Sequence, residues 1–309
     1  MMNIQKNEFY YGFDVGGTKI ELAIFDANFN KLHSQRTYTP THDYKKFIDS
    51  IMGLVEFADN LVNAKGKIGI GIPGIVNHKT KQQLAVNVPC LTGKNLVDEL
   101  THLLNRKVAI ENDCRCFALS EANTEQTKNL SSIFGTILGT GAGGGLVFEG
   151  KLFRGSNGIA GEWGHVPMSA NIINRYNLPL FKCNCGLTAC NERYLSGTGL
   201  AQVLDAKGFS VLNTEGFSQQ LSLGNNEALK LFDMYLDMLA SALASLQLLY
   251  DVDAFVLGGG LSNIQNIYSG LPKKMTDWLL PNVVPAKILP PVFGDSSGVR
   301  GAAMLNQSI

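Results

Sequence analysis

The sequence has no excess of charge of either sign. Its 309 residues include 26 Lys and Arg against 26 Asp and Glu, and charged residues make up only 17% of the chain. A neutral chain has no basic field with which to attract nucleic acid or an anionic membrane surface. We therefore expect a small-molecule substrate as partner, with no nucleic acid and no membrane.

The sequence also lacks an apolar run that would form a secretion signal or cross a bilayer. The first eight residues are mostly polar, and the most apolar helical stretch, residues 227–250, carries four charged side chains on one side: Glu227, Lys230, Asp233 and Asp237. Such charges disfavour a membrane span and fit an amphipathic helix. These absences predict a cytoplasmic protein.

Cysteine is scarce, with six in the chain, yet Cys183, Cys185 and Cys190 lie within one short segment. A disulfide is disfavoured, because Cys183 and Cys185 are too close to pair comfortably. Together with His165, the three thiolates form the closed set of four ligands that structural Zn²⁺ prefers. The alternative is three buried free cysteines beside a core histidine. Cys90, Cys114 and Cys116 follow no recognisable ligand spacing.

No Gly-x4-Gly-Lys-Ser/Thr phosphate-binding motif occurs anywhere, although the chain contains 33 glycines. Glycines cluster instead in two loops, residues 14–19 and 139–145, where backbone N–H groups can approach phosphate oxygens. The second loop contains Gly-x-Gly-x-x-Gly, but a strand over 146–148 follows it, whereas a dinucleotide site needs a helix there. A single glycine loop is more often an ordinary turn. Two such loops in different halves of the chain predict a nucleotide triphosphate held across a cleft.

The hydrophobic patterning predicts two α/β halves. In the first half we expect strands over 9–15, 20–25, 31–38, 67–72 and 108–110, with helices after Thr41, over 96–104 and from about residue 112. In the second half we expect strands over 133–138, 146–148 and 253–257, and a final helix over 297–306. The expected domains are residues 1–117 with 295–309, and residues 118–294.

Several of these motifs together resemble the ROK family of sugar kinases, repressors and related enzymes. The matching stretches are Asp14-x-Gly-Gly-Thr-Lys19, the glycine loop continuing to Gly150 and Gly155, Glu162-x-Gly-His165 and the Cys-x-Cys-x4-Cys run, in the family's order. The resemblance implies an actin-like, ribonuclease H-like sugar kinase fold with two α/β domains around a cleft. It also implies ATP and Mg²⁺ as cofactors, structural Zn²⁺ and a homodimer.

The resemblance also assigns roles to individual residues. It makes Asp113 the general base, whereas the residues alone favour helix N-caps at Asn112 and Asp113. Asp14 would orient hydrated Mg²⁺, and Lys19 would either contact phosphate or be an exposed strand residue. The implied sugar-binding residues are Gly74, Asn87, Asn112, Asp113, Glu162, His165 and Glu192. The alternative for Glu162 and Glu192 is that both are solvated acids without a role in sugar binding. The implied nucleotide-binding residues are Gly12, Asp14, Gly16, Gly17, Thr18, Lys19, Thr140, Gly141, Ala142, Gly143, Gly144, Gly145, Gly259 and Gly260.

The sequence departs from the family pattern at a few positions. Asn184 and Ala189 stand where glycine is usual, and Cys114-Arg115 stands where a small residue and asparagine are usual. The zinc ligands are intact, but Arg115 puts in doubt the hydrogen bonds behind the proposed catalytic helix.

The activity that the resemblance implies is ATP-dependent phosphorylation of the 6-hydroxyl of N-acetyl-D-glucosamine, in amino-sugar salvage and cell-wall recycling. Kinases of glucose, mannose or N-acetylmannosamine, which use the same site, are the alternative. A sugar-sensing repressor is a further alternative, but it would need a DNA-reading segment before Asp14, where only thirteen residues stand.

Overall fold

The computed structural model describes residues 8–77, 79–85, 87–209 and 213–307. The chain forms two compact units. The first contains the described residues up to Asn123, Leu152–Ala160 and those from Asp295 on, and the second contains Thr124–Lys151 and Gly161–Gly294. The expected boundary at residue 117 falls inside helix α3 (Asp113–Ala122), and Leu152–Ala160 clusters with the first unit although we expected it in the second domain.

The first unit is built on a five-stranded sheet with the order β3-β2-β1-β4-β7. Strands β1, β2 and β3 pair antiparallel, and β4 and β7 then add in parallel to β1. The bounds are β1 (Tyr10–Val15), β2 (Lys19–Phe25), β3 (Lys31–Tyr38), β4 (Lys67–Ile72) and β7 (Val108–Asn112). The predicted strands of the first half are therefore confirmed. A small hairpin, β5 (Ile75–Val76) with β6 (Gln83–Leu84), and the 3-10 turn η1 (Pro89–Leu91) follow β4.

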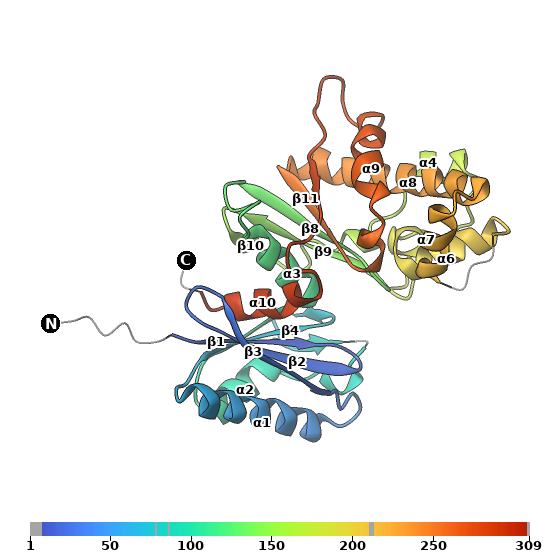
Figure 1. Ribbon diagram of the computed structural model, residues 1–309. Helices are drawn as coiled ribbons and strands as arrows, with labels where there is room; N and C mark the ends of the chain where they lie inside the picture. Colours follow the sequence, from blue (N-terminus) through green and yellow to red (C-terminus); the bar gives the residue numbers. More distant parts are fainter. Residues whose placement is uncertain (1–7, 78, 86, 210–212, 308–309) are drawn as a thin grey trace. The chain divides into compact units, whose positions relative to one another are not determined.

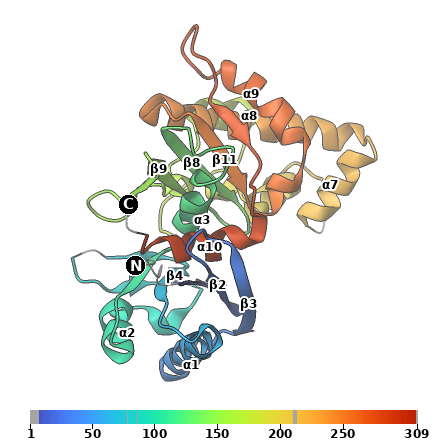
Figure 2. The ribbon, with the colours of Figure 1, turned by 60° about the vertical axis from the view of Figure 1, so that its left-hand side comes forward.

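Two pairs of helices cover the two faces of this sheet. Helices α1 (Tyr44–Val62) and α2 (Leu96–Leu104) lie on one face, and α3 and α10 (Ser297–Met304) lie on the other (Figure 1 and Figure 2). Helix α1 buries the apolar stripe that the 3.6-residue period predicted. We expected Thr41 as its N-cap, but the cap is Asp43, whose side chain accepts from the backbone N–H of Lys46.

Helix α10 packs on the sheet and on α3 with almost no space between the backbones. A Cβ at Gly12 of β1 would lie 1.9 Å from the carbonyl oxygen of Val299, and one at Gly69 of β4 would lie 1.8 Å from that of Ala302. A Cβ at Gly301 would lie 1.7 Å from the carbonyl oxygen of Cys116. The structure therefore gives Gly12 a packing role beneath α10.

The second unit contains a sheet with the order β10-β9-β8-β11-β12. As in the first unit, an antiparallel pair of strands, here β8 and β9, is followed by parallel strands, here β11 and β12. Its strands are β8 (Ser132–Leu138), β9 (Ala142–Phe148), β10 (Lys151–Phe153), β11 (Ala254–Gly258) and β12 (Lys287–Leu289). The strand expected over 146–148 is confirmed, but it begins earlier than expected, at Ala142. Glycine weakens the interior of a strand, yet Gly143, Gly144 and Gly145 pair with residues of β8.

Helices of the second unit supply most of its core. The long helix α8 (Asn226–Tyr250), capped by Asn225, buries most of its middle residues against its neighbours, including α9 (Asn266–Thr276). The other elements are α4 (Ala170–Arg175), α5 (Glu192–Leu195), α6 (Gly197–Ala206), α7 (Thr214–Ser222), and the 3-10 turns η2 (Trp163–His165), η3 (Gly260–Asn263) and η4 (Gly294–Ser296). Within the described residues, no helix has both the length and the apolar character that a membrane span requires.

Candidate functional site

The junction between β7 and α3 brings three of the predicted sugar-binding residues together. Asn112 is the N-cap of α3, and its Oδ1 accepts from the backbone N–H groups of Cys114 (3.0 Å) and Arg115 (3.3 Å). Its Nδ2 donates to the carbonyl oxygen of Gly74 (3.0 Å). Gly74 has a φ of 104°, and a Cβ there would lie 2.0 Å from the carbonyl oxygen of Leu84, so glycine is required. The cap role therefore holds for Asn112, and the cap fixes the direction in which α3 presents Asp113.

Asp113 is the first residue of α3, and its surroundings shift the pKa of its carboxyl group in opposite directions. Its Oδ1 accepts from the backbone N–H of Cys114 (2.9 Å). Burial raises the pKa of Asp113, while the N–H of Cys114 and the charge of Arg115 act in the opposite direction. Burial has the largest effect, so the pKa of Asp113 lies above its ordinary value.

Asp14 is the last residue but one of β1, and it lies close enough to Asp113 for the two charges to interact. Burial raises the pKa of Asp14 to about 7, and the negative charges of Asp113 and Glu21 contribute in the same direction. Two carboxylates that disfavour each other's charge are suited to a nearby divalent cation, which relieves the repulsion. The donor set therefore fits hydrated Mg²⁺.

The turn between β1 and β2 is a tight hairpin turn with an exposed tip. The backbone N–H of Gly16 donates to the carbonyl oxygen of Lys19 (2.9 Å), and the hydroxyl of Thr39 donates to the carbonyl oxygen of Gly16 (2.8 Å). Gly17, Thr18 and Lys19 are exposed. A Cβ at Gly17 would lie 3.2 Å from the carbonyl oxygen of Asn87, so Asn87 lies beside this turn. Lys19 is an exposed residue at the start of β2, and its contact with phosphate stays a prediction.

Glu111 and Arg154 were not among the predicted site residues, yet both lie at the β7–α3 junction. Glu111 is 3% exposed and pairs with Arg115 (3.1 Å) and with Arg154 (2.6 Å). A signal was present in the sequence, since an acid that ends a buried strand beside Asn112 and stands four residues before an arginine predicts a paired charge. Arg154 is distant in sequence, and only the fold shows its contact.

In the second unit, two glycine segments meet. The turn between β8 and β9 is closed by the N–H of Gly139, which donates to the carbonyl oxygen of Gly141 (3.0 Å), and Thr140 at its tip is exposed. Gly259, with a φ of 81°, follows β11, and a Cβ there would lie 2.6 Å from the amide nitrogen of Gly139. The predicted nucleotide-binding residues Thr140, Gly141, Gly259 and Gly260 therefore lie in one place.

The remaining glycines of this loop have a packing role. A Cβ at Gly144 would lie 2.9 Å from the ring of Trp163, and one at Gly164 would lie 2.0 Å from the carbonyl oxygen of Ala142. The indole N–H of Trp163 donates to the carbonyl oxygen of Gly143 (2.7 Å). Gly144 thus makes room on β9 for the turn that carries Glu162 and His165.

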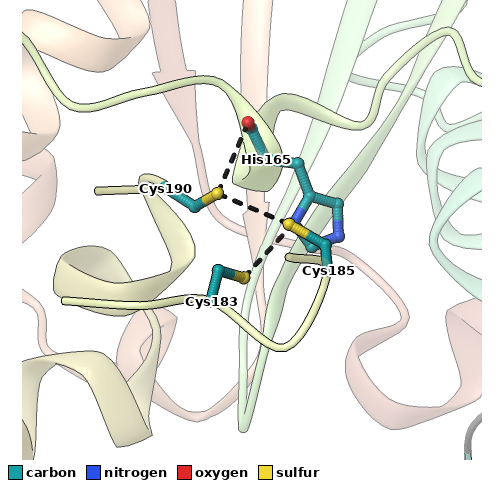
Figure 3. Close-up of side chains that lie close together, drawn as sticks. All are labelled: His165, Cys183, Cys185 and Cys190. Carbon is teal, nitrogen blue, oxygen red and sulfur yellow. Dashed lines mark hydrogen bonds between the residues drawn. The ribbon is translucent and has the colours of Figure 1, made fainter. Parts of the chain in front are cut away.

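The four predicted metal ligands converge (Figure 3). The ligand atoms of His165, Cys183, Cys185 and Cys190 all lie within 4.8 Å of one another. The sulfur atoms of Cys185 and Cys190 are 3.7 Å apart, and the sulfur of Cys183 is 3.8 Å from Nδ1 of His165. Ligands at about 2.3 Å from a central tetrahedral Zn²⁺ would be about 3.8 Å from one another. Ala189, at a usual glycine position, adopts a φ of 60°, the left-handed region that glycine favours.

The chemistry of this cluster suits a cation. Burial raises the pKa of the Cys190 thiol to about 12, and its contacts with Cys185 and Cys183 contribute in the same direction. Thiolates this close together repel one another, and a divalent cation removes that penalty.

Glu192, predicted to contact sugar, links the cysteine cluster to the glycine turn. Its Oε1 accepts from the thiol of Cys183 (3.8 Å), and its Oε2 accepts from the backbone N–H of Ala142 (3.0 Å). A Cβ at Gly141 would lie 2.7 Å from that second oxygen. The carboxylate therefore holds the turn between β8 and β9 as well.

Comparisons with known proteins agree on one family. The sequence profile of the ROK family matches residues 10–309. The chain is 44% identical over 300 residues to the N-acetylgalactosamine kinase AgaK of Shewanella sp. (strain ANA-3), with 97% of each chain covered. It is also 44% identical over 299 residues to the N-acetyl-D-glucosamine kinase of Vibrio atlanticus, with 96% of this chain and 99% of that protein covered. The crystal structure of a ROK hexokinase from Thermus thermophilus superposes with a TM-score of 0.84 at 26% identity, covering 96% of this chain and 97% of the other.

Proposed function

The chain belongs to the ROK family, and on this basis we propose that it is a kinase that transfers the γ-phosphoryl group of ATP to the 6-hydroxyl of an N-acetylhexosamine, with N-acetyl-D-glucosamine as the preferred substrate. The observation that carries the proposal is that relatives covering nearly the whole chain at 44% identity are named as kinases of N-acetylated hexosamines. The sugar kinase fold and the position of Asp113 at the start of α3 support it.

In the proposed mechanism, Asp113 orients the 6-hydroxyl of the sugar and accepts its proton. Phosphoryl transfer passes through a loose transition state, so the base acts mainly by positioning the nucleophile and takes the proton late. A raised pKa brings Asp113 closer to the operating pH and makes it a better proton acceptor than an ordinary carboxylate. Asn112 and Gly74 hold the start of α3 in place for this role.

The residues proposed to contact the nucleotide are residues 16–19 and Thr140, Gly141, Gly259 and Gly260. Asp14 would hold a water of the Mg²⁺ shell, and the Mg²⁺ would neutralise phosphate charge when bound. The four-ligand cluster would hold a structural Zn²⁺, which would fix the turn that presents Glu162.

A panel of sugars with Mg-ATP tests the proposal. N-acetyl-D-glucosamine, N-acetylgalactosamine, N-acetylmannosamine, glucose and mannose are compared by kcat/KM. An acetamido group offers one donor and one acceptor, and a site built to pair both leaves buried groups unsatisfied when glucose binds, at about 1 to 3 kcal/mol each. We therefore expect N-acetyl-D-glucosamine to exceed glucose by roughly tenfold to several hundredfold. Equal efficiency with glucose would favour a general hexokinase.

A second candidate is a kinase of N-acetylgalactosamine, because a relative with this name is as similar as the N-acetyl-D-glucosamine kinase. The two sugars differ only in the direction of the 4-hydroxyl, so the same panel separates them. Sugar binding without phosphorylation of any sugar would instead favour a sensor.

A further inference from the structure

We propose that Arg115 and Arg154 form, with Glu111, a clamp that holds residues 154–160 against the proposed catalytic helix and so positions the sugar-binding turn for phosphoryl transfer. This inference rests on the proposed function. Residues 154–160 form the strap, and Glu111, Arg115 and Arg154 form the clamp.

The clamp attaches both ends of the strap to one carboxylate at the β7–α3 junction. Oε2 of Glu111 accepts from Nε of Arg154 at 2.6 Å, at the beginning of the strap. Oε1 of Glu111 accepts from Nη1 of Arg115 at 3.1 Å, and Nε of Arg115 donates to the carbonyl oxygen of Ala160 at 3.1 Å, at the end of the strap. The strap also closes on itself, since the N–H of Ala160 donates to the carbonyl oxygen of Arg154 (3.3 Å).

Burial makes these contacts strong and specific. The side chains of Arg115 and Glu111 are only 1% and 4% exposed, so water competes little for their hydrogen bonds. A buried charge left without its partner costs several kcal/mol, which holds the clamp together. Oε1 of Glu111 also accepts from the backbone N–H of Asn112 (2.9 Å), so the same carboxylate fixes the residue that caps α3.

The strap is largely exposed, although Gly158 is buried and Ala160 is partly buried. Gly155 and Gly158 have φ values of 71° and 68°, in the left-handed region that favours glycine. The guanidinium contacts of the clamp join the two ends of this exposed segment to the β7–α3 junction.

The position of the strap in the chain gives the clamp its proposed effect. Arg115 stands two residues after Asp113, and Ala160 stands two residues before Glu162. Two residues of chain reach at most about 7 Å. The hydrogen bond between Arg115 and Ala160 therefore limits how far the beginning of the sugar-binding turn can move from the proposed base. Arg115 and Arg154 act through other residues, so they are positioning residues.

Two variants and a matched control test this inference. Arg154→Ala removes an arginine that is 45% exposed, so folding should survive. Arg115→Lys keeps a positive charge for Glu111, but all its N–H donors are on one nitrogen, whereas arginine reaches Glu111 with Nη1 and Ala160 with Nε. Arg175→Ala is the control, because Arg175 is 52% exposed and pairs with the buried Asp237 in a different part of the fold.

Hydrogen exchange and kinetics are measured on all four full-length proteins. In both clamp variants we expect faster exchange over 154–160 and a sugar KM raised about fivefold to fiftyfold, while the KM for ATP stays within about twofold. The control should change neither. Unchanged exchange over the strap, or unchanged sugar KM in an active enzyme, overturns the clamp. A wild-type protein that phosphorylates no sugar would instead reject the proposed function, and the role of the clamp in sugar binding with it.

Discussion

At the scale of single residues, Asp14 carries a charge that its surroundings disfavour. Its pKa is about 7 in the folded unit, against about 3.9 in an unfolded chain. The raised pKa means that folding favours the protonated form, so this contribution to stability is fully present below about pH 4 and is lost as the pH rises through 7. Ionised Asp14 therefore destabilises the ligand-free protein at pH 8.

Asp14→Asn should remove this loss. In the absence of nucleotide and Mg²⁺, the difference in the free energy of unfolding between variant and wild type should grow in favour of the variant from pH 5 to pH 8. We expect a change of about 1 to 3 kcal/mol. It is smaller than the whole pKa difference would give, because Asp14 is partly exposed. Urea denaturation at both pH values measures this. The exposed Asp98 is the control, because Lys81 lowers its pKa, and Asp98→Asn should show no such change in this window. A pH-independent effect of Asp14→Asn would contradict the assignment.

Asp113 provides the second prediction at this scale. Asp113→Asn keeps the size of the side chain and an oxygen that can accept from the N–H of Cys114, so the fold and sugar affinity should be retained. Turnover should fall by on the order of a hundredfold or more, because the positioned proton acceptor is lost. Steady-state kinetics together with sugar titration by calorimetry measures both. Near-normal turnover would mean that Asp113 serves only the start of the helix.

At the scale of elements, α10 depends on glycine for its contact with α3. Gly301→Ala would place a Cβ at 1.7 Å from the carbonyl oxygen of Cys116, which forces the two helices apart. We expect a loss of several kcal/mol in the free energy of unfolding.

Gly53 of α1 is the matched control for this variant, since a Cβ there meets nothing within 4 Å. Gly53→Ala should raise stability by about 0.5 to 1 kcal/mol, because alanine favours helices. Thermal denaturation of both variants gives the comparison. Similar effects at the two glycines would show that α10 adjusts its position freely.

At the scale of the whole molecule, each unit has its own hydrophobic core, and the cysteine cluster belongs to the second alone. We predict about one zinc per chain in protein purified without chelator, and none in Cys185→Ala. Removing the metal should accelerate hydrogen exchange over 161–165 and 183–192, the segments that carry the four ligands, while α1 and α2 of the first unit stay protected.

Cys90→Ala is the control for the metal site, since Cys90 lies in the first unit and hydrogen-bonds to the carbonyl oxygen of Pro40. It should keep its zinc. Elemental analysis and exchange mass spectrometry read out both variants, and zinc-free wild-type protein would remove the metal from the proposal.

The sequence by itself determined the elements whose signals are local. Alternating and periodic apolar residues predicted most strands and helices, and the spacing of His165, Cys183, Cys185 and Cys190 predicted a cluster that the fold brings together. The family followed from motifs in a fixed order. These features are readable because each depends on residues close together in the chain.

Tertiary structure alone decided which glycines serve packing. A run of glycines such as residues 143–145 looks the same in a loop and in a strand, and only the pairing with β8 shows that it is a strand. Likewise, only the fold brings Arg154 to Glu111 and Glu192 to Ala142. The physical reason is that hydrogen bonds and steric exclusion act over a few ångströms, and proximity between residues distant in sequence exists only once the chain has folded.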